Sequence, residues 1–491
     1  MSAGGEDLVM LLSSLPLPTT YDPSADPPGS VDPLGTVAGA EQLADVLLPG
    51  LTARMWRARH LTFAALAALV GERAAQAEGG SEVMRLEARL GLERLFVSAV
   101  ARKDEAKLPG WGPAARRLPG IGLARRAIRA DDQPLGKQNF LKGQAINGPF
   151  GVVQRLARHL DIIDDENRLS RKGETLLLAW SADQELDGVL DDSTSSSSGA
   201  EWLKRLTGRV LKHVKDGHWP GGTWWDTRML AERLRPGQPG RRETRFLFEL
   251  LRSDASVFRR RCIDLLLTGE VVAGFAAATK TDSRKTADQT VLFDHVKPRL
   301  SGRDQQDKEI GFAIALIDAY EQVSGALEAA FRGLLWALTR RGGRGTAADL
   351  LGDTMLTGPL ASTRKRLATA SARLHAGLAD LQAHPHVRES VSAERLDQLL
   401  QDARRGESDV RALAESVMTR HVRVQQQKRK GIWIEQDRQY WLLQPGFGDN
   451  ADSPPSFDGA YLHPYRISNA YSLLKDLGKV QKIKVPDGEE E

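Results

Sequence analysis

Histidine, cysteine and carboxylate side chains could perform catalysis or bind a metal, but their spacing in this 491-residue sequence is incomplete for either task. His384 and His386 form an H-x-H pair near Glu389, yet two histidines fall short of a typical zinc site. Cys262 follows three arginines on an apolar segment, which is more typical of a small buried hydrophobe than of a nucleophile. No nucleophile elbow, Walker loop or dinucleotide-binding glycine motif occurs. The sequence therefore favours a non-catalytic protein without metal or cofactor, although catalytic groups that are distant in sequence would escape such a search.

The segment RRLPGIGLARRAI, residues 116–128, combines a glycine turn with arginines. Its LPGIG core resembles the hairpin of the helix-hairpin-helix family, in which glycine amides at a helix N-terminus face a DNA phosphate without reading the base sequence. The resemblance implies phosphate contacts from Gly120 and Gly122, and Arg125 and Arg126 would add positive charge. Arg126 departs from the alanine that the family pattern favours, and a plain interhelical turn is the competing interpretation.

Residues 148–180, GPFGVVQRLARHLDIIDDENRLSRKGETLLLAW, have the pattern of helix, hairpin and helix and resemble a winged-helix module. Arg155 and Arg158 would lie on the exposed side of the second helix of this module, where side chains could reach a major groove. The expected wing carries three acids at its tip, and the segment holds five basic and five acidic side chains, so it has no net attraction for phosphate. Packing against protein is therefore the alternative role.

The strongest basic cluster is RHVRVQQQKRKGIWI, residues 420–434, which contains no acid. Cationic and aromatic side chains together suit phosphate pairing plus base stacking. The candidate DNA contacts in this cluster are Arg420, Arg423, Lys428, Arg429, Lys430 and Trp433. A solvated helix end followed by a structural hairpin is the alternative. We expect this cluster and the LPGIG turn to contribute more to DNA binding than the winged helix.

Charge, cysteine content and hydropathy limit the class of protein. The net charge is +4, from 68 basic and 64 acidic residues, so attraction for nucleic acid must come from local clusters. A single cysteine excludes a disulfide framework and fits a reducing cytoplasm. The apolar stretch at 61–71 is shorter than the roughly 20 residues that span a bilayer, and the N-terminus lacks the basic start of a signal peptide. We expect a cytoplasmic protein without membrane contact.

Helical periodicity dominates the chain, which predicts a mainly α, multidomain protein with a winged-helix-like module and a small C-terminal β-hairpin around 436–438. The expected helical segments are 40–48, 51–77, 82–102, 200–217, 226–269, about 307–341, 361–383, 391–428 and about 466–477. The expected domains are a loosely ordered arm at 1–35, a helical domain at 36–135, the winged-helix-like module at 136–190, a linker at 191–200, a helical domain at 201–430 and a C-terminal part at 431–491. No internal repeat of fixed period is evident.

Residues 32–63, followed by the winged-helix-like segment, resemble large uncharacterised bacterial proteins of phage-defence gene clusters. The resemblance implies a multi-gene system in which other subunits supply nucleotide hydrolysis or DNA cleavage. We therefore expect a non-catalytic DNA-binding subunit with weak sequence specificity, in contact with other protein subunits. The alternative is a protein-protein adaptor without DNA contact. Only the DNA-binding hypothesis requires the separate basic clusters to converge on one face.

Overall fold

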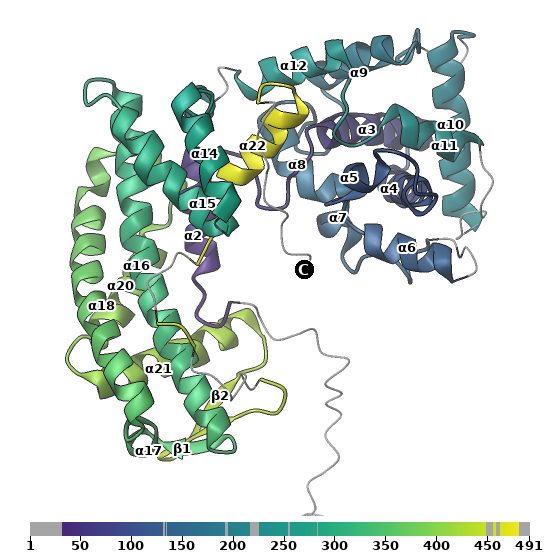
Figure 1. The fold of residues 1–491 in the computed structure, drawn as a ribbon. Helices are drawn as coiled ribbons and strands as arrows, with labels where there is room; N and C mark the ends of the chain where they lie inside the picture. The colour runs from purple at the N-terminus through teal and green to yellow at the C-terminus, as the bar shows by residue number, and fades with distance from the viewer. Residues whose placement is uncertain are drawn as a thin grey trace, which may run out of the picture. The chain divides into compact units, whose positions relative to one another are not determined.

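The computed structural model describes residues 32–130, 133, 135–191, 195–216, 225–253, 256–281, 283–447, 455–457 and 462–480. The described chain is mainly α-helical with one small antiparallel sheet (Figure 1), as the periodicity predicts. It divides into two compact units that are each assembled from distant segments. Unit 1 comprises 1–39, 318–380 and 392–460, and unit 2 comprises 40–317, 381–391 and 461–491.

These units do not follow the predicted domain boundaries. The predicted linker at 191–200 lies within unit 2, and the predicted domain at 201–430 divides between the units at Asp318. The described linker residues are held locally, since Ser195 Oγ donates to Asp191 Oδ2 at 3.1 Å and helix α10 begins at Ser198. The described serines are therefore held by local hydrogen bonds ahead of α10, a role that composition alone does not distinguish from a linker.

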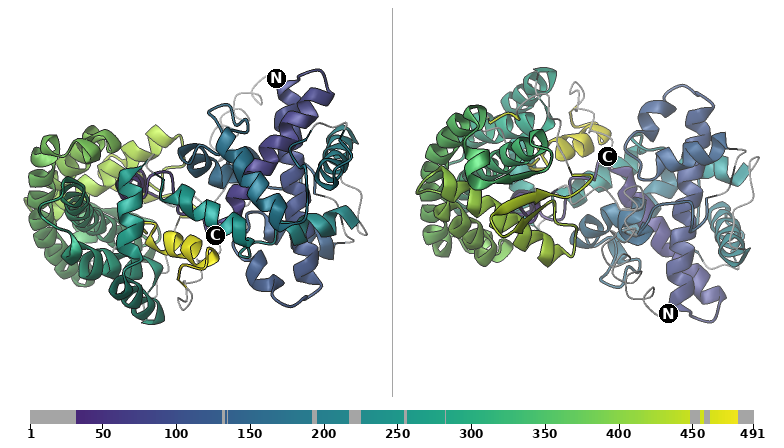
Figure 2. Two further views of the ribbon diagram at one scale, coloured as in Figure 1. Left: turned by 90° about the horizontal axis from the view of Figure 1, so that it is seen from above. Right: turned by 90° about the horizontal axis from the view of Figure 1, so that it is seen from below.

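Helices α3 (Arg59–Ala77) and α4 (Glu82–Glu105) form the centre of unit 2, where they pack along each other (Figure 2). All residues of α3 from Arg59 to Gly71 are buried, and the rings of Phe63 and Phe96 stack at 4.7 Å. The helices around this pair are α5 (Trp111–Ala115), α6 (Ile121–Arg129), α7 (Gln144–Asn147), α8 (Pro149–His159), α9 (Arg171–Asp183), α10 (Ser198–Asp216), α11 (Trp225–Arg233) and α12 (Arg241–Leu251). An apolar helix pair at the centre thus positions the surface helices.

Further helices of unit 2 come from three parts of the chain. They are α13 (Val257–Leu266), α14 (Gly269–Thr281), α15 (Arg284–Thr290), the π-helical turn η1 (Val291–Val296), the short 3₁₀ turns η2 (Lys297–Arg299) and η3 (Leu381–Ala383), α19 (Pro385–Ser390) and α22 (Ile467–Asp476). Two helices contain residues of both units, α2 (Val37–Leu47) and α16 (Gln305–Arg340).

The predicted helix at 51–77 begins later than expected, because residues 51–58 are not helical. Their carbonyls bond to α22: Asn469 Nδ2 donates to the carbonyls of Ala53 and Met55 at 2.9 and 2.8 Å, and Ser472 Oγ donates to that of Trp56 at 2.7 Å. The apolar residues at 51–58 are therefore spaced for burial and not for a helix. Side chains of α22 bind backbone carbonyls that helical hydrogen bonds would otherwise satisfy.

Unit 1 contains α17 (Ala347–Leu351), α18 (Thr354–Asp380), α20 (Ala393–Arg405) and α21 (Val410–Lys428). Helices α18, α20 and α21 pack on one another. The expected helix at 391–428 is broken at 406–409, where Gly406 ends α20 and the Asp409 carboxylate accepts the Ala412 amide at 2.9 Å to cap α21. This cap fixes a helical hairpin.

The sheet of unit 1 has the strand order β1-β3-β2. The predicted hairpin is confirmed as β2 (Ile434–Asp437) and β3 (Tyr440–Leu443), joined by a turn in which Arg438 has φ 55°. A third strand that the sequence did not indicate, β1 (Arg344–Thr346), pairs antiparallel with β3.

The expected apolar helix at about 307–341 is confirmed as α16. By length and composition, α16 is the single described helix that could cross a membrane, and α13 with α14 would count as a further span only as a pair bent by 71°. The most apolar window of α16 is 72% buried within the protein, as is typical of a core helix.

Candidate nucleic-acid interface

The LPGIG turn is the second copy of a ten-residue repeat that the sequence analysis missed. Residues 108–117 read LPGWGPAARR and residues 118–127 read LPGIGLARRA, identical at six of ten positions. We call residues 102–129, which contain both copies, the tandem-turn segment. Direct comparison of neighbouring decapeptides would have revealed the repeat.

Both copies fold in the same way. Gly110 and Gly120 have φ/ψ of 78°/3° and 82°/0°, and the following amides of Trp111 and Ile121 both donate to the leucine carbonyl three residues earlier at 3.1 Å. These angles define type II turns, which favour proline and then glycine at the central positions. Each turn leads directly into a helix, α5 or α6, so the repeat places two helix N-termini in succession.

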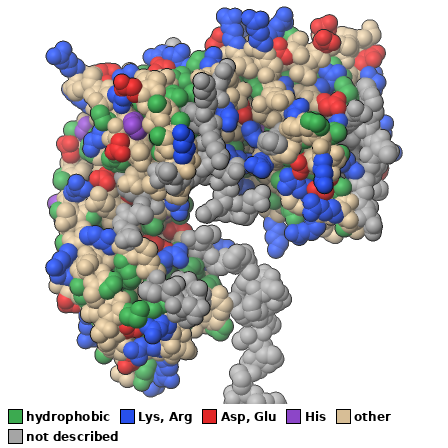
Figure 3. Space-filling model, in the orientation of Figure 1, with side chains coloured by type: hydrophobic (Ala, Val, Ile, Leu, Met, Phe, Trp, Pro, Cys, Tyr) green, Lys and Arg blue, Asp and Glu red, His purple; other side chains and the backbone are tan. Residues whose placement is uncertain are grey.

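The tandem-turn segment is strongly basic. It holds eight Lys and Arg residues against Asp104 and Glu105, a net charge of 8 − 2 = +6, or +4 when Asp131 and Asp132 are included. Lys107, Arg116 and Arg126 are exposed. In Figure 3, Lys and Arg side chains gather over α6. The surface thus carries a local positive charge that the whole-chain value of +4 hides.

The four predicted residues of this turn have different environments. Gly122 is exposed in the first turn of α6, and a Cβ there would meet no atom within 4 Å, so the space beside its Cα is open. Gly120 is covered by the ring of Phe140. Arg125 Nε donates to Asp104 Oδ2 at 2.7 Å, whereas the exposed Arg126 has no ion pair among the described residues. Gly122 and Arg126 are therefore the accessible pair.

The basic cluster at 420–434 is largely occupied by contacts within unit 1. Arg420 is 5% exposed, and its Nη1 lies 2.6 Å from Oδ2 of the buried Asp402. Arg423 bonds to both carboxylate oxygens of Asp402. The DNA contact of Arg420 stays a prediction, and its buried guanidinium would reach a phosphate only if the pair with Asp402 opened.

The same face of α21 holds the segment that precedes α2. Arg420 Nε donates to the Leu34 carbonyl at 2.7 Å, Gln425 Nε2 to the Pro33 carbonyl at 3.0 Å, and Lys428 Nζ to the Asp32 carbonyl and carboxylate, each at 2.7 Å. Residues 32–35 are therefore fixed against α21, which corrects the predicted arm at its C-terminal end. Residues 1–31 lie outside the described residues.

The end of the cluster divides into exposed cations and a packed aromatic. Arg429 and Lys430 are exposed, with Arg429 in the left-handed conformation that ends α21. Trp433 stacks on Phe447 at 5.4 Å, and its amide donates to His421 Nε2 at 2.9 Å. Trp433 therefore contributes to the fold of unit 1. A base could stack only on an exposed face of its indole ring, and packing on Phe447 reduces the area of the ring that is exposed.

In the winged-helix-like segment, α8 is followed by a tight hairpin with one bridge, Ile163 to Leu169, and then by α9. Arg155 pairs with Asp45, and the two groups are 2.5 Å apart. Arg158 Nη2 donates to the Asp165 carbonyl and to Asn167 Oδ1 at 2.9 and 3.0 Å, which ties α8 to the hairpin. Both predicted contact residues therefore have partners within unit 2, and the winged-helix assignment stays a prediction.

A second basic surface was missed on α10, where residues 202–215 contain five Lys and Arg residues and no acid. The exposed positions include Lys204, Arg205, Arg209 and Lys212, while Trp202, Leu206 and Val210 are buried. The sequence could have indicated this surface, because the cations recur at helical spacing in a stretch without acidic residues. Helices α6 and α10 both pack on α4.

The groups considered for catalysis or metal binding have structural surroundings. Cys262 is buried, which raises the pKa of its thiol to about 12 and makes it a poor nucleophile. His384 and His386 stack on Phe312 and Phe258. Among the described residues, no three His, Cys, Asp or Glu side chains are placed to hold a metal ion.

Comparison of the chain with protein-family models, with curated proteins and with solved structures finds no match in any of the three. The site is therefore interpreted from its own geometry and charge.

Proposed function

We propose that unit 2 binds double-stranded DNA through the phosphate backbone, with the tandem-turn segment as the contact surface. The observation that carries this proposal is the exposure of Lys107, Arg116 and Arg126 in the tandem-turn segment, which also contains the open position Gly122 in the first turn of α6. Cations attract the polyanion, and free amides at a helix N-terminus suit a single phosphate oxygen.

Binding of this kind has weak sequence specificity, because phosphate contacts position a protein and base contacts specify the sequence. The candidate base-reading residues Arg155 and Arg158 are engaged by Asp45 and by the hairpin. We assign the protein the role of a non-catalytic DNA-binding subunit. Membership of a multi-subunit bacterial defence system is part of the proposal and is supported by the resemblance of residues 32–63.

A protein-protein adaptor is the second candidate. Two exposed apolar side chains favour it, Ile146 on α7 at 72% and Leu178 on α9 at 49% exposure. Exposed apolar side chains are suited to docking a partner protein, although single ones are common on protein surfaces.

Fluorescence anisotropy with two unrelated duplexes at low salt distinguishes these functions. The triple variant Lys107→Ala, Arg116→Ala, Arg126→Ala should bind both duplexes roughly tenfold or more weakly. Loss of cations that contact phosphates lowers the affinity for every DNA sequence to the same extent. The matched control is Lys365→Ala, Arg395→Ala, Arg404→Ala, which removes the same charge from exposed positions on α18 and α20. Absence of DNA binding by the wild type would instead support the adaptor, and equal loss in both variants would contradict the tandem-turn segment as the contact surface.

A further inference from the structure

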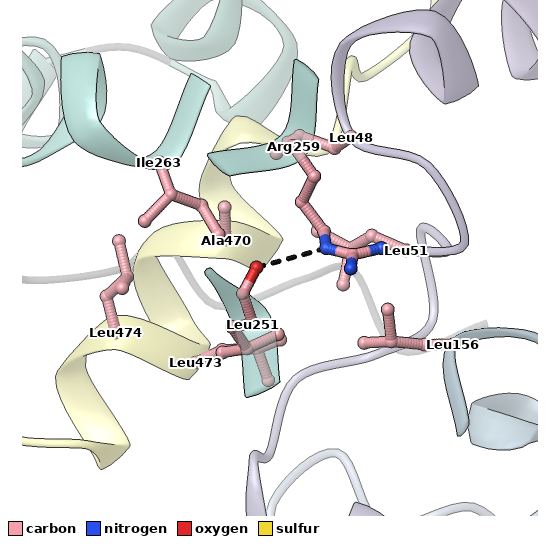
Figure 4. A pocket seen from close by; sticks show the side chains of 9 residues that line it. All are labelled: Leu48, Leu51, Leu156, Leu251, Arg259, Ile263, Ala470, Leu473 and Leu474. Atoms are coloured by element: carbon pink, nitrogen blue, oxygen red, sulfur yellow. Dashed lines mark hydrogen bonds between the residues drawn. The ribbon is translucent and has the colours of Figure 1, made fainter. Parts of the chain in front are cut away.

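The cations of unit 2 are of two kinds, buried and exposed. Arg259 of α13 is 1% exposed and lies among leucine side chains such as Leu51 and Leu156 (Figure 4). Its Nε donates to the Leu251 carbonyl at 3.1 Å (Figure 4), and its Nη1 donates to the Pro49 carbonyl at 3.2 Å. Such an arginine stabilises the fold of unit 2 and does not meet a ligand in solution. The cations of α10 are of the exposed kind.

Helix α10 has an apolar inner face and a basic outer face. The inner face packs on α4, where a Cβ at Gly91 would meet Val214 at 3.2 Å and Val210 at 3.4 Å. Arg94 Nε of α4 also donates to Nε2 of the buried His213 at 3.2 Å. The outer face therefore points away from α4. Its exposed cations are Lys204, Arg205, Arg209 and Lys212.

Several of these cations are available to a ligand. Lys204 and Lys212 have no ion pair within the described residues. Arg205 forms an exposed pair with Glu201, with 3.8 Å between Nη2 and Oε2, and a surface pair contributes so little free energy that a phosphate can replace it. Lys204 and Lys212 are roughly 12 Å apart along the helix axis. A duplex carries about one phosphate charge per 1.7 Å of its axis, so several cations of α10 can contact phosphates together.

The side chains of this face favour duplex DNA over other polyanions. An amphipathic helix that binds a membrane inserts its apolar face into the lipid, whereas Trp202, Leu206 and Val210 of α10 are buried in the protein. Single-stranded nucleic acid is bound through bases that stack on aromatic side chains, and α10 exposes none, because Trp202 and His213 are both buried. A duplex backbone requires only a row of cations, which α10 provides.

The basic faces of α10 and α6 point in different directions. Helix α6 packs on the C-terminal end of α4, where Arg125 and Arg129 pair with Asp104 and Glu105. These acids lie roughly 20 Å further along α4 than Gly91 and about a quarter turn around it. Figure 1 accordingly shows α6 and α10 on adjoining sides of α4. A duplex on one face would have to bend sharply to reach the other, and DNA is stiff over such lengths.

We propose that α10 is a second surface for the duplex backbone, so that one molecule bridges two DNA segments. This inference rests on the proposed function, because it takes the tandem-turn segment as the first DNA-binding surface. The stiffness of DNA favours a separate segment on α10 over a bend in the segment already bound. Because α10 lacks the LPGIG turn, its surface is filled second, at higher DNA concentration.

Analytical ultracentrifugation of the full chain, at low salt with excess duplex of about 10 base pairs, or one helical turn, counts the duplexes on each chain. We expect two for the wild type. The α10 variant Lys204→Ala, Arg205→Ala, Lys212→Ala should bind one, and so should the tandem-turn variant Lys107→Ala, Arg116→Ala, Arg126→Ala. The α10 substitutions lie on an exposed helix face where alanine is favourable, so the fold is kept. Lys204→Glu, Lys212→Glu is a second α10 variant with the same expected result.

Energy transfer between donor-labelled and acceptor-labelled duplexes measures bridging directly. It should occur with the wild type and with the control Lys365→Ala, Arg395→Ala, Arg404→Ala, and be lost in both the α10 and the tandem-turn variants. A single duplex on the wild type, kept in the α10 variants and lost in the tandem-turn variant, would overturn bridging and leave the proposed function intact. A complex of two chains with two duplexes would assign the energy transfer to a dimer and also overturn it. No duplex on the wild type would contradict both proposals.

Discussion

Arg420 and Asp402 form a buried ion pair across the hairpin of α20 and α21, with 2.6 Å between Nη1 and Oδ2. Both side chains are at most 5% exposed. Arg423 bonds to the same carboxylate, and Arg420 also bonds to the Leu34 carbonyl. The most basic stretch of unit 1 therefore stabilises its own fold through this pair.

Arg420→Ala should lower the free energy of unfolding by about 3 kcal/mol, because it leaves the buried Asp402 with only the more exposed Arg423 and Arg405 as ion-pair partners. Urea unfolding measures this change, and Arg404→Ala, an exposed residue on α20, is the control with an expected change within about 0.5 kcal/mol. DNA affinity should stay constant in the folded variant. A variant of wild-type stability that no longer bound DNA would return Arg420 to the ligand-contact role that the sequence suggested.

Gly122 and Gly120 should respond in opposite ways to substitution by alanine. Gly122→Ala should raise stability by roughly 0.5–1 kcal/mol, because the position is helical and open, and should weaken DNA binding by crowding the amide. Gly120→Ala should lower stability, since φ is +82° and the added methyl meets Phe140. Thermal unfolding and anisotropy on both variants provide the measurements. Stabilisation by Gly122→Ala with unchanged DNA affinity would argue against the phosphate contact.

Local patterns in the sequence predicted the helices and the hairpin, since apolar spacing, caps and turns act over a few residues. They did not predict the two units, which are built from distant segments. The sequence also did not show which arginines are free to contact a ligand. This depends on partners that are distant in sequence, such as the Leu34 carbonyl that binds Arg420. The sequence indicated the basic LPGIG turn. It did not indicate that Gly122 and Arg126 are the accessible residues, because this depends on Phe140, which covers Gly120, and on Asp104, which binds Arg125.

Glu93 should make unit 2 less stable as the pH rises. Burial raises the pKa of Glu93 to about 7, although Gln144 Nε2 and the Phe150 amide donate to its carboxylate. The folded state therefore holds a proton that the unfolded state releases near pH 4.5, so stability decreases between about pH 4.5 and 7, by up to about 3 kcal/mol. Glu93→Gln should flatten this dependence in urea unfolding at several pH values. An unchanged slope would exclude Glu93 as its source.

His421 should act in the opposite direction in unit 1. Burial lowers the pKa of His421 to about 4, and its neutral ring donates from Nδ1 to the Pro33 carbonyl and accepts the Trp433 amide at Nε2. The unfolded state takes up a proton near pH 6.5, so stability contributed by the neutral ring is lost as the pH falls from about 6.5 to 4. His421→Gln should reduce the acid sensitivity of unfolding while lowering stability at pH 8. Equal acid sensitivity of the two proteins would contradict this role.

The salt dependence of DNA affinity tests the proposed phosphate contacts most directly. The slope of log affinity against log salt concentration falls in magnitude by about 0.9 for each duplex phosphate that a variant no longer neutralises. For Lys107→Ala, Arg116→Ala, Arg126→Ala we predict a slope smaller in magnitude by roughly 2–3 than that of the wild type. Lys428→Ala, Arg429→Ala, Lys430→Ala should change it less, because Lys428 is engaged by Asp32. A wild-type slope near zero, or an unchanged slope in the tandem-turn variant, would contradict DNA binding by this surface.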